Sequence, residues 1–207
     1  MPSSWSIGLP PRRSFHRSLS DNSRETTSQG GTGQAANRFW SELPDGGFQR
    51  PIFVAATRQH VGKTTVSLAL MSGLQKRFGK IGFLKPVGQQ HVQVFSEEQN
   101  HDIRVDKDCV LVREWFHLDH IDYQDMSPVI IPRGYTKKYV DGEIEEGQQL
   151  SQVERAMESV AQSSDIVMCE GTGHCAVGSI VDANNAKVAS LLGADMILVA
   201  NGGLGEW

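Results

Sequence analysis

The feature that most constrains the fold of this chain is an apolar strand pattern, followed by a short loop and then by an apolar helix. The strand is expected at Ile52–Ala56, and the loop ends at residues 62–65 with the sequence Gly-Lys-Thr-Thr. Apolar side chains recur at helical spacing through residues 63–78, and we expect Gly79 to form a left-handed cap. A second apolar run at 81–85 completes a strand–helix–strand unit with a right-handed parallel crossover.

The remainder of the chain continues this alternation after an irregular insertion at about 91–150. The insertion is polar, acidic and rich in turn signals, with one helix expected at 108–116. A helix is then predicted at 151–163, where Ser151 forms the cap and Glu154 stands at capping-box spacing. A strand at 165–170 follows, then a helix at 183–192 that ends at Gly193, and finally a strand at 196–200. Alternating strands and helices predict an α/β fold with a doubly wound parallel sheet, whose ligand lies beyond the carboxyl ends of the strands.

The N-terminal segment, residues 1–48, differs in composition from the predicted α/β domain at 49–207. It is rich in serine and arginine and has no acidic residue before Asp21, which is typical of a mitochondrial or plastid transit peptide. The alternative is a disordered tail or a mis-assigned start, and the protein would then be cytoplasmic. We expect this segment to take no part in the fold.

Charge, hydropathy and cysteine content exclude several classes of protein. The chain carries 20 basic and 24 acidic residues and a net charge of -4, which argues against binding nucleic acid or anionic lipid. No apolar run approaches the roughly 18 residues of a membrane span, so no membrane partner is expected. Three cysteines are too few for a disulfide scaffold and favour a reducing compartment.

The loop after the first strand has the composition of a phosphate-binding loop. In a Gly-x4-Gly-Lys-Thr loop, backbone N–H groups and the helix N-terminus bind phosphates, the lysine adds a cation, and the threonine hydroxyl holds Mg²⁺. Gly62, Lys63 and Thr64 match this pattern, whereas Thr57 stands where the first glycine is expected. The alternative is a purely structural helix start. The predicted nucleotide-binding residues are Thr57, Arg58, Gln59, His60, Val61, Gly62, Lys63, Thr64 and Thr65.

A magnesium–nucleotide site also needs carboxylates at neighbouring strand ends. Glu170 closes a predicted strand and precedes a Gly-Thr-Gly segment, although it could instead cap the segment that follows. Asp106 or Asp108 could supply a second carboxylate, and the sequence does not separate them. Lys85 follows the second strand and either points toward the same crevice or is a solvated lysine at a strand end.

Several spaced motifs give the chain a family resemblance. They are Phe53-Val-Ala-Ala-Thr-Arg-Gln-His-Val-Gly-Lys-Thr64, Lys85-Pro-Val87, Lys107-Asp-Cys-Val110 and Glu170-Gly-Thr-Gly173. Together they resemble dethiobiotin synthetase and its relatives, which include cobyrinic acid a,c-diamide synthase and the BioD-like domain of some phosphate acetyltransferases. The resemblance covers about residues 51–205, and the stretch at 171–182 is nearer to the cobyrinate and acetyltransferase branch.

The resemblance implies chemistry with ATP, Mg²⁺ and a small carboxylate substrate, which is activated by phosphoryl or adenylyl transfer. It implies that Lys63 stabilises the transferring phosphoryl group and that Lys85 contacts the phosphate or the substrate carboxylate. It further implies that Thr64, Asp108 and Glu170 hold Mg²⁺ directly or through water. Two alternatives stay open: a nucleotide-sensing regulatory module, as in the acetyltransferase-fused relatives, and an inactive truncated fragment.

Several departures from the pattern of the family qualify this interpretation. Ala56 replaces a loop glycine, and residues 89–91, Gln-Gln-His, replace the small residues beside the diaminononanoate pocket. Arg58 stands where partition-type ATPases carry a lysine that crosses a dimer interface, so a homodimer is one hypothesis and a solvated arginine the other. The chain stops at Trp207, soon after the last predicted strand, and we expect a sheet that is incomplete there.

Overall fold

The computed structural model describes residues 39–42, 48–145, 147–173, 178–179 and 181–202. The chain divides into two compact units, residues 1–31 and 32–207, and the first lies wholly outside the described residues. Most of the N-terminal segment therefore falls outside the described residues, and its targeting role stays a prediction. The expectation that residues 1–48 take no part in the fold is wrong for the end of the segment, because Phe39 is buried in the core and the Trp40 indole N–H donates to the Gly193 carbonyl at 3.1 Å. Within the described ranges, no helix is both long and apolar enough to cross a membrane.

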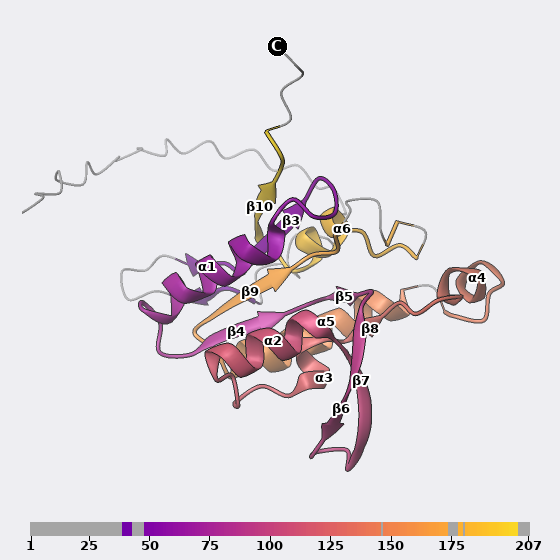
Figure 1. The fold of residues 1–207 in the computed structure, drawn as a ribbon, viewed down its shortest axis with the longest axis horizontal. Coiled ribbons are helices and arrows are strands. Elements are labelled where there is room, and N and C mark those ends of the chain that lie inside the picture. The colour runs from indigo at the N-terminus through magenta and orange to yellow at the C-terminus, as the bar shows by residue number, and fades with distance from the viewer. Residues whose placement is uncertain (1–38, 43–47, 146, 174–177, 180, 203–207) are drawn as a thin grey trace, which may run out of the picture. The chain divides into compact units, whose positions relative to one another are not determined.

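A four-stranded parallel sheet forms the centre of the fold (Figure 1). Its strands are β3 (Ile52–Ala56), β4 (Ile81–Leu84), β9 (Ile166–Glu170) and β10 (Asp195–Val199). In space they follow the order β10, β3, β9, β4. Every residue of β4 and β9 is buried, as expected of parallel strands that are covered on both faces. The predicted α/β fold with a parallel sheet is confirmed, and each strand lies within one residue of its predicted bounds.

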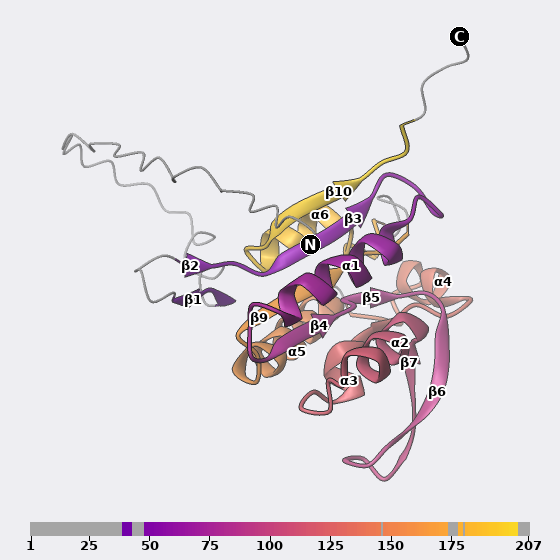
Figure 2. The ribbon, with the colours of Figure 1, turned by 60° about the vertical axis from the view of Figure 1, so that its left-hand side comes forward.

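Helices cover both faces of this sheet (Figure 2), with α1 in front of it in that view and α5 and α6 behind. The helices are α1 (Lys63–Gln75), α2 (Lys107–Phe116), α3 (Tyr123–Met126), α4 (Tyr135–Val140), α5 (Gln148–Gln162) and α6 (Asn185–Leu191). The end of α2 meets the end of α1, where the Gln75 side-chain amide donates a hydrogen bond to the Phe116 carbonyl at 3.3 Å. The two helices therefore form one continuous layer in front of the sheet, and α2 carries this layer past strand β4.

The predicted C-terminal end of the first helix is wrong. Helix α1 ends at Gln75 with Lys76 as its cap, because the N–H groups of Arg77 and Phe78 fold back onto the Leu74 carbonyl, at 2.9 Å each. Gly79 consequently lies beyond the helix and is not left-handed. At the C-terminal end of α6, by contrast, Gly193 has φ 58 and follows the cap, as predicted.

The predicted capping box at Ser151 is also wrong. Helix α5 begins three residues earlier, after Gly147, whose φ of 82 is easily adopted only by glycine. Ser151 then lies in the first turn, and its hydroxyl donates to the Gly147 carbonyl at 3.2 Å. A serine hydroxyl that turns back to a carbonyl in this way cannot cap the helix.

The insertion at 91–150 is more ordered than its composition indicates. Strands β6 (His91–Ser96) and β7 (His101–Asp106) form an antiparallel hairpin that extends away from the central sheet (Figure 1). Short strands β5 (Val87–Gly88) and β8 (Val129–Ile130) pair in parallel beside β4, and β1 (Ser41–Glu42) pairs with β2 (Phe48–Gln49). The prediction of a helix at 108–116 is confirmed to within one residue by α2.

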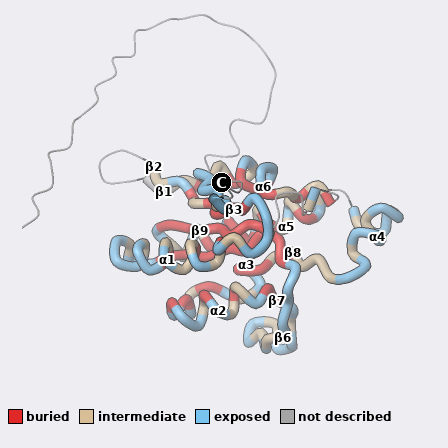
Figure 3. The backbone as a smooth tube through the Cα atoms, turned by 45° about the horizontal axis from the view of Figure 1, so that its top comes forward, coloured by how far each residue is buried: buried red, intermediate tan, exposed pale blue. Residues whose placement is uncertain are grey.

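Burial is concentrated at the centre of the sheet, as Figure 3 shows for β9. The outermost strand of the sheet, β10, is different, because its side chains Met196, Ile197 and Leu198 are exposed. No strand among the described residues pairs with its outer edge. The carboxyl ends of β3, β4 and β9 lie together, and the candidate site is there.

Candidate functional site

The loop between β3 and α1 leaves the helix N-terminus open. Gly62 precedes the helix with φ 91, and a Cβ atom there would meet nothing within 4 Å, so this position requires glycine for its conformation and not for space. No described side chain caps the first turn of α1. The unpaired N–H groups of such a turn are ready to bind an anion.

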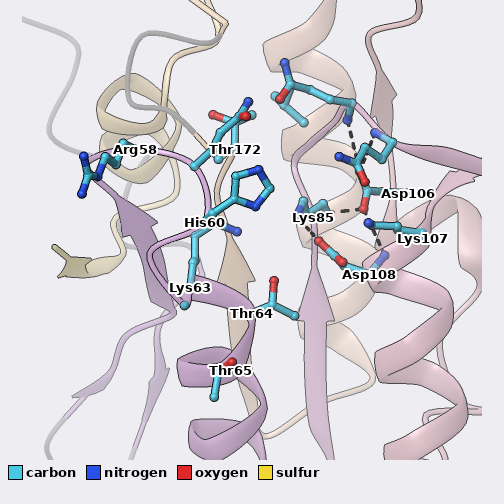
Figure 4. Close-up of a pocket in the computed structure, with 16 residues that line it drawn as sticks. Arg58, His60, Lys63, Thr64, Thr65, Lys85, Asp106, Lys107, Asp108 and Thr172 are labelled. Atoms are coloured by element: carbon cyan, nitrogen blue, oxygen red, sulfur yellow. Dashed lines mark hydrogen bonds and ion pairs between the residues drawn. The ribbon is translucent and has the colours of Figure 1, made fainter. Parts of the chain in front are cut away.

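The residues of this loop divide into two groups. Arg58, Gln59, His60, Gly62, Lys63, Thr64 and Thr65 line a cavity of about 410 Å³, whereas Thr57 and Val61 do not. The Thr57 N–H instead donates to the Val199 carbonyl at 3.1 Å, which continues the pairing of β3 with β10. Figure 4 shows the Arg58 side chain directed away from the charged residues across the cavity.

The opposite wall of the cavity comes from the segments that follow β4, β7 and β9. It consists of Lys85, Val87, Gln89, Gln90, Asp106, Lys107, Asp108, Thr172 and Gly173. Together with the loop after β3, these segments place the cavity beyond the carboxyl ends of the parallel strands β3, β4 and β9. Ligands of doubly wound folds bind in this place.

A buried ionic cluster forms the floor of this cavity. Oε1 of Glu170 accepts hydrogen bonds from the ammonium groups of both Lys63 and Lys85, the latter at 2.9 Å. The Lys85 ammonium also donates to Oδ2 of Asp108 at 2.5 Å. Glu170 is fully buried and Lys85 is only 5% exposed, so Lys85 is not a solvated lysine. Among the described residues, Glu170 does not cap the segment that follows it.

The cluster shifts the pKa values of its members in different directions. Burial alone would raise the pKa of Glu170, but the charges of Lys85 and Lys63 lower it to about 2. Burial alone would lower the pKa of Lys85, yet the carboxylates around it raise that pKa above its usual range. The pKa of Lys63 is lowered, because burial and repulsion from Lys85 outweigh the attraction of Glu170.

The structure separates the roles of Asp106 and Asp108. The Asp106 carboxylate accepts hydrogen bonds from three backbone N–H groups, those of Gln89 at 3.1 Å, Gln90 at 3.4 Å and Asp108 at 3.0 Å. It is therefore the cap of α2 and anchors the chain after β5. Asp108 in the first turn of α2 faces Lys85, and its carboxylate remains directed toward the cluster (Figure 4).

The predicted metal ligands are hard oxygen donors that lie close together. The Thr64 hydroxyl lies 3.4 Å from Oε1 of Glu170, and Lys85 connects Glu170 to Asp108. Oε2 of Glu170 is buried and has no hydrogen-bond partner in the described structure. This donor set fits Mg²⁺, which binds one or two carboxylates and keeps several waters. No three His, Cys, Asp or Glu side chains within the described ranges converge into a metal-binding group.

Asn185, at the start of α6, is a site residue that the sequence did not reveal. Its amide oxygen accepts hydrogen bonds from the N–H and hydroxyl of Thr172, at 3.0 and 3.1 Å, and its amide nitrogen donates to the Thr172 carbonyl at 3.3 Å. A Cβ atom on Gly171 would lie 2.6 Å from the same amide oxygen. Asn185 thereby positions the cavity segment Thr172–Gly173, and a single asparagine near a predicted helix start carries no signal of that contact.

A lysine and a threonine at the start of a helix that follows a buried parallel strand, with a carboxylate at the next strand end, define a P-loop NTPase-like nucleotide-binding domain. The sequence profile of the AAA domain family (AAA_26) matches residues 50–207. The chain belongs to this family.

Curated relatives of the chain share one name. Phosphate acetyltransferase of Nitratidesulfovibrio vulgaris is 27% identical over 155 residues, which cover 73% of this chain and 20% of the relative. The enzymes of the same name from Pseudomonas aeruginosa and Deinococcus radiodurans are 28% and 26% identical over 152 residues, covering 72% and 73% of this chain and 19% of each relative. The chain therefore spans about one fifth of the length of these relatives. Their name is the one that the acetyltransferase branch of the resemblance carries.

Proposed function

We propose that this chain binds Mg-ATP through the loop at 57–65 and acts as a nucleotide-sensing module of the type fused to phosphate acetyltransferases. The observation that carries the proposal is the open N-terminus of α1 directly above the cluster of Lys63, Glu170, Lys85 and Asp108. N–H groups and the Lys63 ammonium face the cavity from the side of the loop, and the Lys85 ammonium and the Asp108 carboxylate face it from the opposite wall. A chain of phosphates with a divalent cation matches this distribution of charge.

Within this proposal, Lys63 and Lys85 neutralise phosphate oxygens, and Thr64, Asp108 and Glu170 hold Mg²⁺ directly or through water. The metal, when bound, supplies further neutralisation of the phosphate charge. Gln59, His60 and Thr65 line the same cavity and contact the nucleotide from the loop. The likeness to a fused module is supported by the name shared by the relatives, and the sensing role is supported by the polar residues 89–91, which replace the small residues of the dethiobiotin synthetase pattern.

A second candidate function is activation of a small carboxylate by phosphoryl or adenylyl transfer. It is favoured by Lys85, because a cation on the far side of the phosphate loop is suited to orient an attacking carboxylate. Phosphate or pyrophosphate release that requires a carboxylate would establish this function. Nucleotide binding without turnover across a carboxylate panel would favour the sensing role.

The test of nucleotide binding is calorimetric titration of the full chain with Mg-ATP. The variant Lys63→Ala removes a cation from the floor of the cavity, and we expect it to abolish measurable binding. The matched control is Lys76→Ala, which removes an exposed lysine just beyond the end of the same helix and should bind like the parent. Cooperative thermal unfolding of all three proteins checks their folding. A folded parent that fails to bind Mg-ATP would contradict the proposal.

A further inference from the structure

The Lys85 ammonium occupies the space between the two carboxylates that the proposed function assigns to a metal ion. Its Nζ lies 2.5 Å from Oδ2 of Asp108 and 2.9 Å from Oε1 of Glu170, with Oδ1 of Asp106 further away at 3.9 Å. A divalent cation at this place would compete for the same oxygen atoms. The Lys85 ammonium and a divalent cation therefore cannot both occupy the position between Asp108 and Glu170.

The charges around this position disfavour a metal ion that arrives alone. Lys63 and Lys85 already neutralise the carboxylates of Glu170 and Asp108, and Asp106 is committed to backbone N–H groups. A bare divalent cation would add two positive charges beside two buried ammonium groups, and repulsion over such short distances is strong in a buried site. A bound phosphate chain would remove this repulsion, because its negatively charged oxygens offer the Lys85 ammonium new partners.

Lys85 can leave this position without moving the fold. Its backbone N–H is anchored to the Met126 carbonyl at 2.7 Å, whereas its side chain lines the cavity and rotates about a flexible four-carbon stem. The carboxylate that it would release retains unused capacity, because Oε2 of Glu170 is buried without a hydrogen-bond partner in the described structure. A buried acceptor of this kind lacks the partner that buried polar groups normally have, and a cation can supply it.

We infer that Lys85 is an internal cation that makes the site selective for a metal–phosphate complex over a free metal ion. This inference rests on the proposed Mg-ATP function and adds a specificity-determining residue to it. When the complex binds, the ammonium would exchange Asp108 and Glu170 for phosphate oxygens, and the two carboxylates it releases would hold the divalent cation. Without a phosphate-bearing ligand, the ammonium remains and excludes the metal.

The test measures binding of Mn²⁺ alone to the full chain by electron paramagnetic resonance. The variant Lys85→Met removes the charge at similar length, and Lys107→Met removes a lysine that lines the same cavity but is exposed. We expect Lys85→Met to bind Mn²⁺ at least about tenfold more tightly than the parent, and Lys107→Met to bind it as weakly as the parent does. Mn²⁺ should also raise the melting temperature of Lys85→Met and leave that of the parent unchanged.

A second arm uses the parent chain, so that the inference stays testable if Lys85→Met does not fold. Inorganic tripolyphosphate should strengthen Mn²⁺ binding to the parent about tenfold or more. Tight binding of Mn²⁺ alone to the parent would overturn the inference, and so would a folded Lys85→Met that binds no better than Lys107→Met. These metal-only outcomes are independent of the ATP titration, whose failure would instead contradict the proposed function.

Discussion

The ammonium of Lys85 lies 2.9 Å from Oε1 of Glu170, although the two residues are 85 positions apart in the sequence. Strand pairing explains this proximity. Strands β4 and β9 are parallel neighbours in which Leu84 pairs with Cys169, so the residues that follow these two reach the edge of the sheet side by side. The ionic cluster is a direct consequence of the register of the sheet.

Replacing Glu170 with glutamine should destabilise the protein strongly. Glu170 is fully buried and is the shared partner of Lys63 and Lys85, so the substitution leaves the buried Lys63 ammonium without its charge partner and leaves Lys85 with Asp108 as its close carboxylate. Breaking a buried pair in this way costs about 3–5 kcal/mol. Urea unfolding measures the loss, with the exposed Glu97→Gln as the control that should change little. A loss below about 1 kcal/mol, the level of an exposed pair, would mean that the cluster is solvated.

The same carboxylate predicts how stability depends on pH. The pKa of Glu170 is lowered from 4.5 to about 2 in the folded protein, so folding favours the ionised form. The stabilisation is therefore fully present above the unfolded pKa, and it is lost as pH falls from about 4.5 toward 2. Free energies of unfolding measured from pH 6 to pH 2.5 should decline across this window. The decline should be shallower in Glu170→Gln, and equal slopes would contradict the assignment.

The sequence predicts the parallel strands well because each is a short apolar run with clear boundaries. Strands β3, β4 and β9 are buried, and burial on both faces requires continuous apolar residues that are easily read. The hairpin of β6 and β7 was missed because both strands are largely exposed and carry polar and charged side chains. Tertiary context and not local hydropathy determines such an element.

The candidate site was predictable where a motif or a strand end marks it. Lys63 and Thr64 follow from the loop pattern, and Glu170 follows from its position at the end of an apolar run. The sequence could not separate Asp106 from Asp108, because the difference depends on which carboxylate is saturated by backbone N–H groups. Such pairing depends on three-dimensional proximity to Gln89 and is invisible in a single sequence.

Arg58 tests whether a second copy of the chain takes part in the site. Its side chain is exposed, lines the cavity and is directed away from the cluster of its own chain, which suits contact with a ligand held by a partner. If a homodimer forms at this face, Arg58→Ala should reduce both the dimer fraction and any ATP hydrolysis. Sedimentation velocity with and without Mg-ATP measures the first effect, with the exposed Lys80→Ala as the control. An unchanged dimer fraction and unchanged hydrolysis would identify Arg58 as a solvated loop residue.

Replacing Asn185 with alanine should weaken both folding and nucleotide binding. The substitution removes three hydrogen bonds to the buried residue Thr172, and losing hydrogen bonds to a buried residue costs about 1–3 kcal/mol. Thr172 and Gly173 line the cavity, so their displacement should also raise the dissociation constant for Mg-ATP. Urea unfolding and calorimetric titration measure the two effects separately.

The neighbouring residue provides the matched control for this prediction. Asn184 caps α6 by accepting a hydrogen bond from the Lys187 N–H at 2.9 Å. Asn184→Ala should therefore cost about 1 kcal/mol of stability, as the loss of a helix cap does, and leave the affinity for Mg-ATP unchanged. Both variants destabilise the start of α6, but only Asn185 forms hydrogen bonds with Thr172. A difference in Mg-ATP affinity between the two variants would therefore come from that contact. An equal loss of affinity in both variants would mean that Asn185 acts through the stability of α6 and not by positioning the cavity segment.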